Sequence, residues 1–210
     1  MSLPEPVMLY DTPRAPNPRR VRIFLAEKGI ELPRATVDIM AGDQFAEGFR
    51  RKVGSHNVPA LELSDGTVLT ETVAICRYLE ALHPEPNLMG RDALEQARVE
   101  MWSRRVEFQL MLPVAAVARH GIPAMAVLEH GDQCPEWAQA NVSRVAKGIA
   151  WLEESLSGKT FLAGDAFTVA DITAIATVGF MRLIRTPIPE GNSATQAWLA
   201  RCQARGTIVD

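Results

Sequence analysis

Hydrophobic and polar positions alternate between strand-like and helix-like patterns over the first eighty residues. Short apolar or β-branched runs predict strands at 7–10, 34–39, 59–63 and 67–69. The last two flank Ser64-Asp65-Gly66, a turn typical of a hairpin. Apolar residues three and four apart predict helices at 16–28 and 71–82. A weaker, charged pattern predicts a further short helix at 43–52. The order is βαβαββα, a compact mixed α/β unit.

A proline-rich segment separates this unit from a second part with a different pattern. Residues 83–87 cannot continue a helix, because each proline forces extended backbone on the residue before it. We therefore predict a domain at 1–82, a linker at 83–91 and a second domain at 92–210. Strand signals nearly vanish in the second domain, and helices are predicted at 92–119, 135–156, 168–182 and 193–205. We expect Pro113 to kink the first of these helices. The fold class is α/β followed by an all-helical bundle.

Composition and charge exclude several classes of function for the 210 residues. The net charge is −3, without the basic footprint of nucleic-acid binding. No apolar run approaches the roughly 18 residues of a membrane span, and the N-terminus lacks the pattern of a signal peptide. Cys76, Cys134 and Cys202 are odd in number and scattered. This usage indicates a reducing, cytoplasmic compartment and argues against a metal cluster or a dithiol redox site.

The helix predicted at 168–182 opens with a strong local signature. Thr168 as N-cap and Asp171 three residues later form a capping box, and the flanking Phe167 and Ile172 are placed for a hydrophobic staple. We expect Asp171 to serve the start of the helix and to have no role in chemistry.

Four short motifs follow one another along the chain. They are Leu9-Tyr10-Asp11 with the segment 15–23, Asn57-Val58-Pro59-Ala60-Leu61, the segment 69–75, and the segment 161–165 with Thr168-Val169-Ala170-Asp171. Each is weak alone, but together, in register, they resemble the cytosolic glutathione S-transferases, in particular bacterial-type members with theta-, delta- and nu-like features. The resemblance covers nearly the whole chain. It implies a thioredoxin-like N-terminal domain, a helical C-terminal domain and a homodimer.

The resemblance assigns two parts of glutathione to residues of this chain. Val58-Pro59 matches a cis bond whose first residue pairs its backbone with the cysteinyl unit, as an added strand would. Taken alone, Pro59 would simply begin a strand. Glu71-Thr72 matches the pair that holds the γ-glutamyl end, with Thr72 and a backbone N–H on the carboxylate and Glu71 on the ammonium. A helix start suits an anion, although the same pair without a ligand is an ordinary first turn.

The glycyl end is matched less firmly. His56 corresponds to a histidine that contacts the glycyl carboxylate in some delta- and theta-like members, and an imidazole donor suits that carboxylate. The alternative is an exposed loop histidine. Asn57, Lys52 and Arg14 are weaker candidates for the same end.

The catalytic position departs from the family pattern. Many members have Ser, Thr or Cys immediately before the proline that starts the first helix, where this chain has Ala15. Asn17 matches an asparagine of nu-like members that contributes to the thiolate contact, with help from the helix N-terminus. The alternative is that Asn17 serves the helix backbone. Thr12 is a further nearby hydroxyl, and Tyr10 need not be the catalytic tyrosine of other classes.

The second substrate is expected against the start of the long helix at 92–119. Trp102, Arg105 and Phe108 are the candidates for its pocket, and Arg105 would suit an acidic co-substrate. Packing or dimer contacts are the alternative for most residues of this stretch, including Met111 and Leu112. The identity of the electrophile does not follow from the sequence, since apolar pockets that contain methionine accept varied ligands.

The predicted function is that of a glutathione transferase that conjugates glutathione to a small electrophile, typical of detoxification. Glutathione is the co-substrate, and neither a cofactor nor a metal ion is expected. The predicted partners do not include nucleic acid or a membrane. Two alternatives remain: glutathione-dependent reduction of a disulfide or peroxide, and a non-enzymatic glutathione-binding regulator of the same fold. Ala15 favours the regulator, whereas the retained Val58-Pro59 and Glu71-Thr72 pairs argue against it.

Overall fold

The computed structural model describes residues 3–208 of the chain. Their contacts separate into two units, one ending at Pro86 and one running from Asn87 to Ile208. The division falls within the segment 83–91. Leu88 of that segment is buried, and its carbonyl oxygen accepts a hydrogen bond from the N–H of Val169 at 2.9 Å. The later part of the segment thus packs as part of the second unit.

The first unit has the predicted βαβαββα order. Its elements are β1 (Pro6–Asp11), α1 (Pro16–Lys28), β2 (Arg34–Thr36), a 3₁₀ turn η1 (Asp43–Phe45), α2 (Glu47–Val53), β3 (Ala60–Leu63), β4 (Val68–Leu69) and α3 (Thr72–Leu82). The sheet order is β2-β1-β3-β4, with β2 parallel to β1 and the other two pairs antiparallel. The predicted fold class is confirmed.

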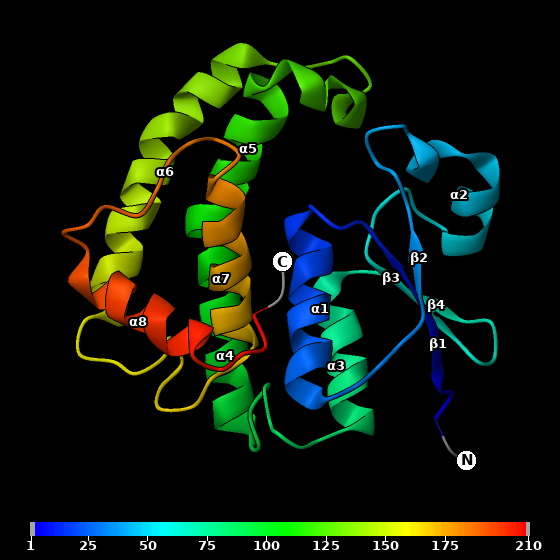
Figure 1. Ribbon diagram of the computed structural model, residues 1–210, viewed down its shortest axis with the longest axis horizontal. Helices are drawn as coiled ribbons and strands as arrows, with labels where there is room; N and C mark the ends of the chain where they lie inside the picture. The colour runs from blue at the N-terminus through cyan, green and yellow to red at the C-terminus, as the bar shows by residue number, and fades with distance from the viewer. Residues whose placement is uncertain (1–2, 209–210) are drawn as a thin grey trace. The chain divides into compact units, whose positions relative to one another are not determined.

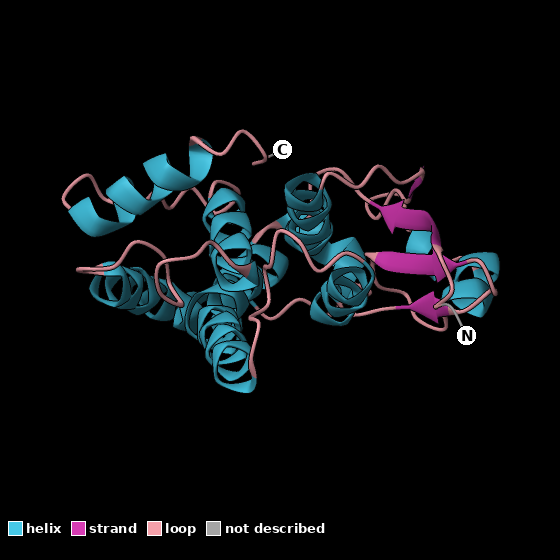
Figure 2. Cartoon of the chain, turned by 90° about the horizontal axis from the view of Figure 1, so that it is seen from below, coloured by secondary structure: helices cyan, strands magenta, loops and turns pink. Residues whose placement is uncertain are grey.

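Helices cover both faces of this sheet. Helices α1 and α3 lie side by side on one face and α2 lies on the other (Figures 1 and 2). The layer under α1 and α3 is apolar because the two helices and the central strands contribute fully buried side chains to it; among these are Leu9, Phe24, Leu61, Ile75 and Leu79. In contrast, Val53 is the only buried residue of α2.

Two predicted elements of this unit are shorter than expected. The strand predicted at 34–39 ends at Thr36, because the carboxylate of Asp38 accepts hydrogen bonds from the N–H groups of Met40 and Ala41 at 2.9 and 3.1 Å. Such a contact turns the chain. The helix predicted at 43–52 is divided into η1 and α2.

The second unit is helical, as predicted. Its elements are α4 (Ala93–Val106), a π-helical segment η2 (Glu107–Met111), α5 (Leu112–Gly121), a 3₁₀ segment η3 (Pro123–Glu129), α6 (Pro135–Leu156), α7 (Val169–Met181) and α8 (Ser193–Gln203). Most residues of α7 are buried, and α7 packs along α4, while α6 packs against α5 and α8.

The helix predicted at 92–119, with a kink expected at Pro113, is divided into α4, η2 and α5. The irregularity lies at Glu107–Met111, before Pro113, as a π-helical turn. A proline inside a helix removes one N–H and its ring clashes with the carbonyl four residues earlier, here that of Gln109. The wider π turn relieves this conflict. Helix α6 passes very near the same carbonyl, since a Cβ atom on Gly148 would lie 2.4 Å from the Gln109 oxygen.

The capping box at the start of α7 is confirmed. Asp171 accepts hydrogen bonds from the N–H and the hydroxyl of Thr168 at 3.0 and 3.2 Å. Its other oxygen accepts from the N–H of Leu162 and the indole N–H of Trp198, both at 3.0 Å. Burial raises the pKa of Asp171, and these four donors oppose the increase. One carboxylate therefore joins α7, α8 and the preceding loop.

Candidate functional site

The residues singled out for glutathione gather at one end of the sheet in the first unit. Leu61 of β3 lies opposite Leu69 of β4, so two steps further along this antiparallel pair Pro59 comes level with Glu71. Tyr10 of β1 lies opposite Ala60, so the chain that leaves β1 passes the same end. The segment after β1, the start of β3 and the start of α3 therefore meet there.

The Val58-Pro59 peptide bond is cis, as the resemblance implies. Pro59 is buried and Val58 is half-buried. Within residues 3–208, neither the N–H nor the carbonyl of Val58 has a hydrogen-bond partner. Both groups can therefore pair with the backbone of a bound peptide.

Glu71 is the N-cap of α3, which begins at Thr72, one residue later than predicted. The backbone of Glu71 has φ 66° and ψ 114°, a conformation that is uncommon for a residue other than glycine and is concentrated at functional sites. Its side chain is exposed, and Thr72 is buried. The N–H groups of the first turn of α3 have no partner inside the helix, so this end suits a carboxylate.

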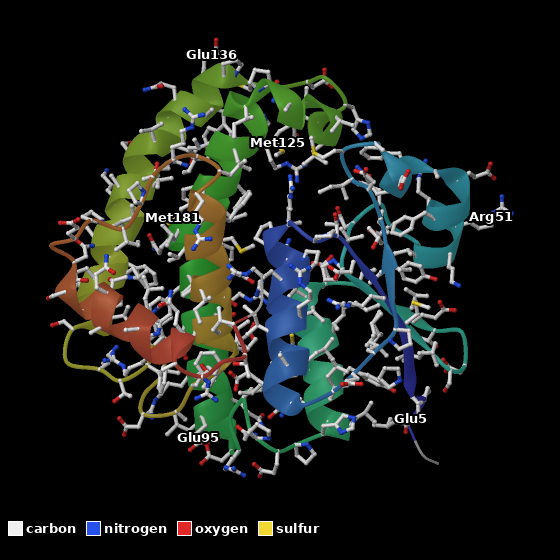
Figure 3. All side chains as sticks on the ribbon, viewed as in Figure 1. Glu5, Arg51, Glu95, Met125, Glu136 and Met181 are labelled. Atoms are coloured by element: carbon white, nitrogen blue, oxygen red, sulfur yellow. The ribbon has the colours of Figure 1, made fainter. Side chains whose placement is uncertain are left out.

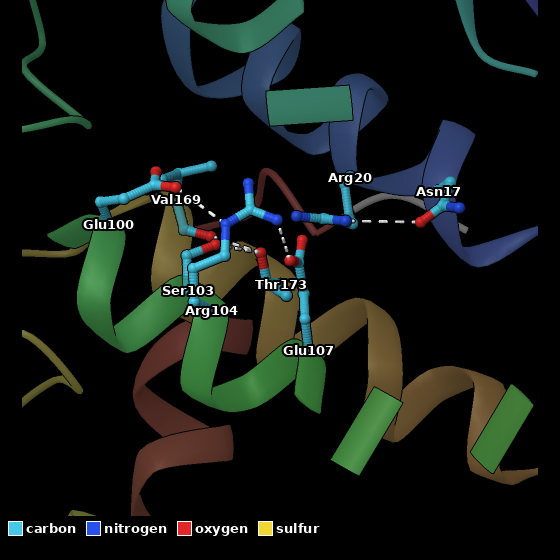
Figure 4. Close-up of polar contacts among 8 residues, drawn as sticks. All are labelled: Asn17, Arg20, Glu100, Ser103, Arg104, Glu107, Val169 and Thr173. Carbon is cyan, nitrogen blue, oxygen red and sulfur yellow. Dashed lines mark hydrogen bonds and ion pairs between the residues drawn. The ribbon is translucent and has the colours of Figure 1, made fainter. Parts of the chain in front are cut away.

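At the start of α1, the catalytic candidate Asn17 is exposed. Ala15 is the N-cap and makes no side-chain capping bond. Because Pro16 and Pro18 have no N–H, Asn17 provides the first backbone donor of the helix. The amide oxygen of Asn17 accepts a long hydrogen bond from Arg20, at 3.4 Å (Figure 4). With its oxygen toward Arg20, the amide NH₂ group of Asn17 faces away from Arg20.

The loop between β1 and α1 is held by a buried ion pair that sequence reasoning missed. Arg22 donates to the carboxylate of Asp11 at 2.7 Å, to the carbonyl of Thr12 at 3.1 Å and to that of Pro13 at 2.7 Å. The second catalytic candidate, Thr12, is buried. The signal for this pair was an arginine on the inner face of α1, which is interpretable only once the loop geometry is known.

The candidates for the glycyl end lie in the loop before β3. His56 and Asn57 are exposed. The ring of His56 lies 5.6 Å from that of Phe45, and the N–H of Asn57 donates to the hydroxyl of Ser55 at 2.9 Å. Arg14, the other weak candidate, is exposed on the loop before α1.

Lys52, the remaining glycyl candidate, is engaged in an ion pair. Its ammonium lies 2.9 Å from the carboxylate of Glu62 on β3, and the hydroxyl of Tyr10 donates to the same carboxylate oxygen at 2.8 Å. These contacts lower the pKa of Glu62 and raise the pKa of Lys52. The hydroxyl of Tyr10 is therefore engaged in a hydrogen bond with Glu62.

The second-substrate candidates lie in the second unit. Trp102 is half-buried, with the Arg105 guanidinium 5.0 Å and the Lys159 ammonium 4.0 Å from its ring centre and the ring of Trp151 at 6.2 Å. One face or edge of Trp102 is thus in contact with two cations and a second indole. Phe108, in the π segment, is 61% exposed.

Two further features of the second unit were not predicted. Arg104 of α4 donates to Glu100 at 2.8 Å and to Glu107 at 2.6 Å (Figure 4). A pocket of about 360 Å³ lies between the end of α6 and α8, and its lining includes Lys159 and Arg201. None of the predicted second-substrate residues lines this pocket.

The three cysteines are free: Cys76 and Cys202 are buried, and Cys134 is exposed. Burial raises the pKa of Cys76 to about 12. Among the described residues, no three His, Cys, Asp or Glu side chains are grouped to hold a metal ion. No single described helix is long and apolar enough to cross a membrane; only the pair 93–121 and 123–129, bent by 107°, meets the length and composition criteria together.

Comparison with known proteins gives consistent matches along the chain. Residues 15–82 match the family described as "Glutathione S-transferase, N-terminal domain", and residues 135–201 match "Glutathione S-transferase, C-terminal domain". The chain is 34% identical to Glutathione S-transferase 2 of Saccharomyces cerevisiae over 204 residues, which cover 96% of this chain and 88% of that protein.

Solved structures give the same result. Gtt2 from Saccharomyces cerevisiae is similar with a TM-score of 0.91 at 34% identity, covering 96% of this chain and 98% of that one. A glutathione S-transferase domain-containing protein from Marinobacter aquaeolei is similar with a TM-score of 0.91 at 39% identity, covering 97% of this chain and 100% of that one.

Proposed function

Since the chain belongs to the glutathione S-transferase family and is a glutathione transferase, we propose that the end of the sheet in its first unit binds glutathione. The observation that carries this proposal is the strand register: it brings the cis Val58-Pro59 bond and the start of α3 to one edge. The backbone of Val58, which can pair with a peptide, and a helix end that suits an anion then lie side by side.

We assign the three parts of glutathione to three groups of residues. The γ-glutamyl carboxylate binds the Thr72 hydroxyl and the free N–H groups of α3, and its ammonium binds Glu71. The cysteinyl unit pairs with the N–H and carbonyl of Val58, next to Pro59. His56 and Asn57 donate to the glycyl carboxylate.

Activation of the thiol is electrostatic in this proposal. Asn17 donates its amide N–H to the sulfur, and Thr12 is the second candidate donor; the N-terminus of α1 adds its dipole. Lowering a thiol pKa from about 8.5 to about 6.5 requires about 2.7 kcal/mol of preferential thiolate stabilisation. A hydrogen bond to a charged group contributes about 1.5–3 kcal/mol, so one amide and a helix end are of the right size.

The remaining assignments concern the electrophile and the setting. We propose that Trp102, Arg105 and Phe108 contribute to the second-substrate pocket, and that the enzyme uses neither a cofactor nor a metal ion. We further propose a cytoplasmic homodimer that acts in detoxification, with no nucleic-acid or membrane partner. Three free cysteines are consistent with a reducing compartment.

Calorimetric titration with glutathione, followed by turnover assays, tests this function. The assays use an aryl halide, an organic peroxide and a glutathione-containing disulfide. We expect glutathione binding and turnover of the aryl halide. Turnover of the disulfide or the peroxide without the aryl halide would favour the reductase. Binding without any turnover would favour the regulator, and absence of binding would reject the site.

Replacing Glu71 and Thr72 together by alanine tests the γ-glutamyl assignment. Because each lost charged hydrogen bond is worth about 1.5–3 kcal/mol, glutathione affinity should fall at least about tenfold. Calorimetry on the folded double variant measures this, with circular dichroism as the check on folding. An unchanged affinity would remove the pair from the site.

A further inference from the structure

Three side chains from three elements of the first unit meet at one carboxylate oxygen. Glu62 Oε2 accepts from the ammonium of Lys52 on α2 at 2.9 Å and from the hydroxyl of Tyr10 on β1 at 2.8 Å. Glu62 is on β3 and shares a sheet face with Tyr10, since Met8 pairs with Glu62 and Tyr10 with Ala60. The Lys52 ammonium also lies 5.6 Å from the centre of the Tyr10 ring.

This cluster attaches α2 to the sheet. Helix α2 has seven residues and buries only Val53. On the side facing the sheet, Phe49 packs edge-on against Tyr10 with a centroid distance of 5.9 Å. Phe49 and Lys52 are three residues apart and thus on one helix face, so both act on Tyr10 and its partner.

The Lys52–Glu62 ion pair also closes a loop along the chain. The residues between its ends include the four that the proposed function places on the cysteinyl and glycyl parts, namely His56, Asn57, Val58 and Pro59. On one side the loop leaves α2 through Gly54, at φ 73°; on the other it enters β3 directly after Pro59. The ion pair joins these two ends directly, at 2.9 Å.

We propose that Lys52, Glu62 and Tyr10 are positioning residues that order the segment 53–59 for the cysteinyl and glycyl parts of glutathione. The inference rests on the proposed function of that segment. Lys52 accordingly acts through Glu62 and does not bind the glycyl carboxylate. Ordering a loop before the ligand arrives removes that cost from binding.

Glutathione and its truncated form γ-glutamylcysteine distinguish a positioning lysine from a ligating one. If Lys52 bound the glycyl carboxylate directly, replacing Lys52 would weaken the binding of glutathione alone. Replacing Glu62 would then leave the affinity unchanged or improve it. If instead Lys52, Glu62 and Tyr10 order the segment 53–59, as a clamp, replacing them weakens the binding of both peptides. The reason is that Val58 pairs with the cysteinyl unit that both contain. In a clamp, moreover, Glu62 and Lys52 act as one unit, so their effects do not add.

The test is calorimetry of both peptides on the wild type, Glu62→Gln, Lys52→Met, the double variant and Tyr10→Phe. Glu62→Gln and Lys52→Met should each raise the Kd of both peptides about three- to tenfold. The Kd of the double variant should not exceed that of the single variant that binds more weakly. Tyr10→Phe, which keeps the ring, should have a smaller effect. Steady-state kinetics should show a raised KM for glutathione with kcat unchanged at saturation.

The matched control is Glu47→Gln, which removes an exposed ion pair with Arg51 on the same helix. Arg51 points outward from α2 (Figure 3), so affinity should not change. Loss of glutathione affinity in Lys52→Met alone, with γ-glutamylcysteine unaffected, would overturn the inference in favour of direct contact. Unchanged affinity in all variants would also overturn it.

Amide hydrogen exchange gives a readout without any ligand. The N–H groups of residues 53–58 should exchange faster in Glu62→Gln than in the wild type and Glu47→Gln. Equal rates would contradict the clamp. A wild type that binds no glutathione would overturn the proposed function instead, and the exchange rates would then decide whether the clamp orders the segment.

Discussion

Where many members of the family have a serine, threonine or cysteine, this chain has Ala15, and the nearest side-chain donor on α1 is Asn17. Its amide oxygen faces Arg20, so its NH₂ group is the part left for the sulfur. The two prolines around Asn17 remove backbone donors that would otherwise share this role. In the proposed function, this one side chain should therefore contribute a large part of the thiol activation.

Replacing Asn17 by alanine should raise the pKa of bound glutathione toward its free value by about one to two units, because one hydrogen bond to a thiolate is lost. Affinity for the protonated form should change little, since other contacts hold the ends of the peptide. Ultraviolet titration of the thiolate measures the pKa.

Ala15→Ser is the complementary variant. It supplies a second donor and should lower the same pKa if its hydroxyl is within hydrogen-bond reach of the sulfur. If Asn17→Ala leaves a depressed pKa unchanged, the donor is Thr12 or a backbone N–H. A wild type without any depression would favour the non-enzymatic alternative.

At this scale the sequence predicted residue types better than residue partners. The cis Val58-Pro59 bond and the Glu71-Thr72 position followed from the family motifs. The partners of Lys52, Tyr10 and Arg22 did not, because each contact depends on how a helix or loop folds back onto the sheet, and no local pattern encodes it.

At the scale of single elements, Asp171 has more partners than a capping box requires. Loss of a helix cap alone costs about 0.5–2 kcal/mol. In the structure, Asp171→Ala also strips acceptors from the buried N–H of Leu162 and the indole of Trp198. Each unsatisfied donor costs about 1–3 kcal/mol, so the free energy of unfolding should fall by about 3–5 kcal/mol.

Urea denaturation measures this loss, with Asp165→Ala, at an exposed position of the same loop, as the control. Glutathione affinity of folded Asp171→Ala should be near that of the wild type. Unchanged stability together with weaker binding would show that Asp171 serves the substrate.

Element types were predictable and their irregularities were not. Hydrophobic spacing predicted the order of strands and helices in the first unit and the helical character of the second. The π turn at Glu107–Met111 depends on how Pro113, the Gln109 carbonyl and Gly148 of α6 fit together. Of these three groups, only Pro113 can be recognised in the sequence as a cause of irregularity, because the other two matter only once the helices are packed.

At the scale of the whole molecule, the proposed homodimer needs an exposed apolar surface. Helix α4 carries Leu94 and Met101, which are seven residues apart and both exposed. A seven-residue spacing places side chains on one helix face, and contiguous exposed apolar side chains mark interaction surfaces.

Met101→Glu should therefore shift the protein from dimer to monomer in sedimentation analysis, because it places a charge within an apolar contact. Leu183→Glu changes a side chain of comparable exposure, just beyond α7, and should leave the dimer intact. A dimer that survives Met101→Glu would assign the interface to another surface.

The distribution of the cysteines has a practical consequence for spectroscopy. Alkylating dyes react with accessible thiolates. Cys76 and Cys202 are buried, and Cys76 has a pKa of about 12, whereas Cys134 is exposed just before α6. A maleimide fluorophore should thus attach at Cys134 alone in the unmodified sequence. It would give a single-site optical label in the second unit, while every residue proposed to hold glutathione is in the first.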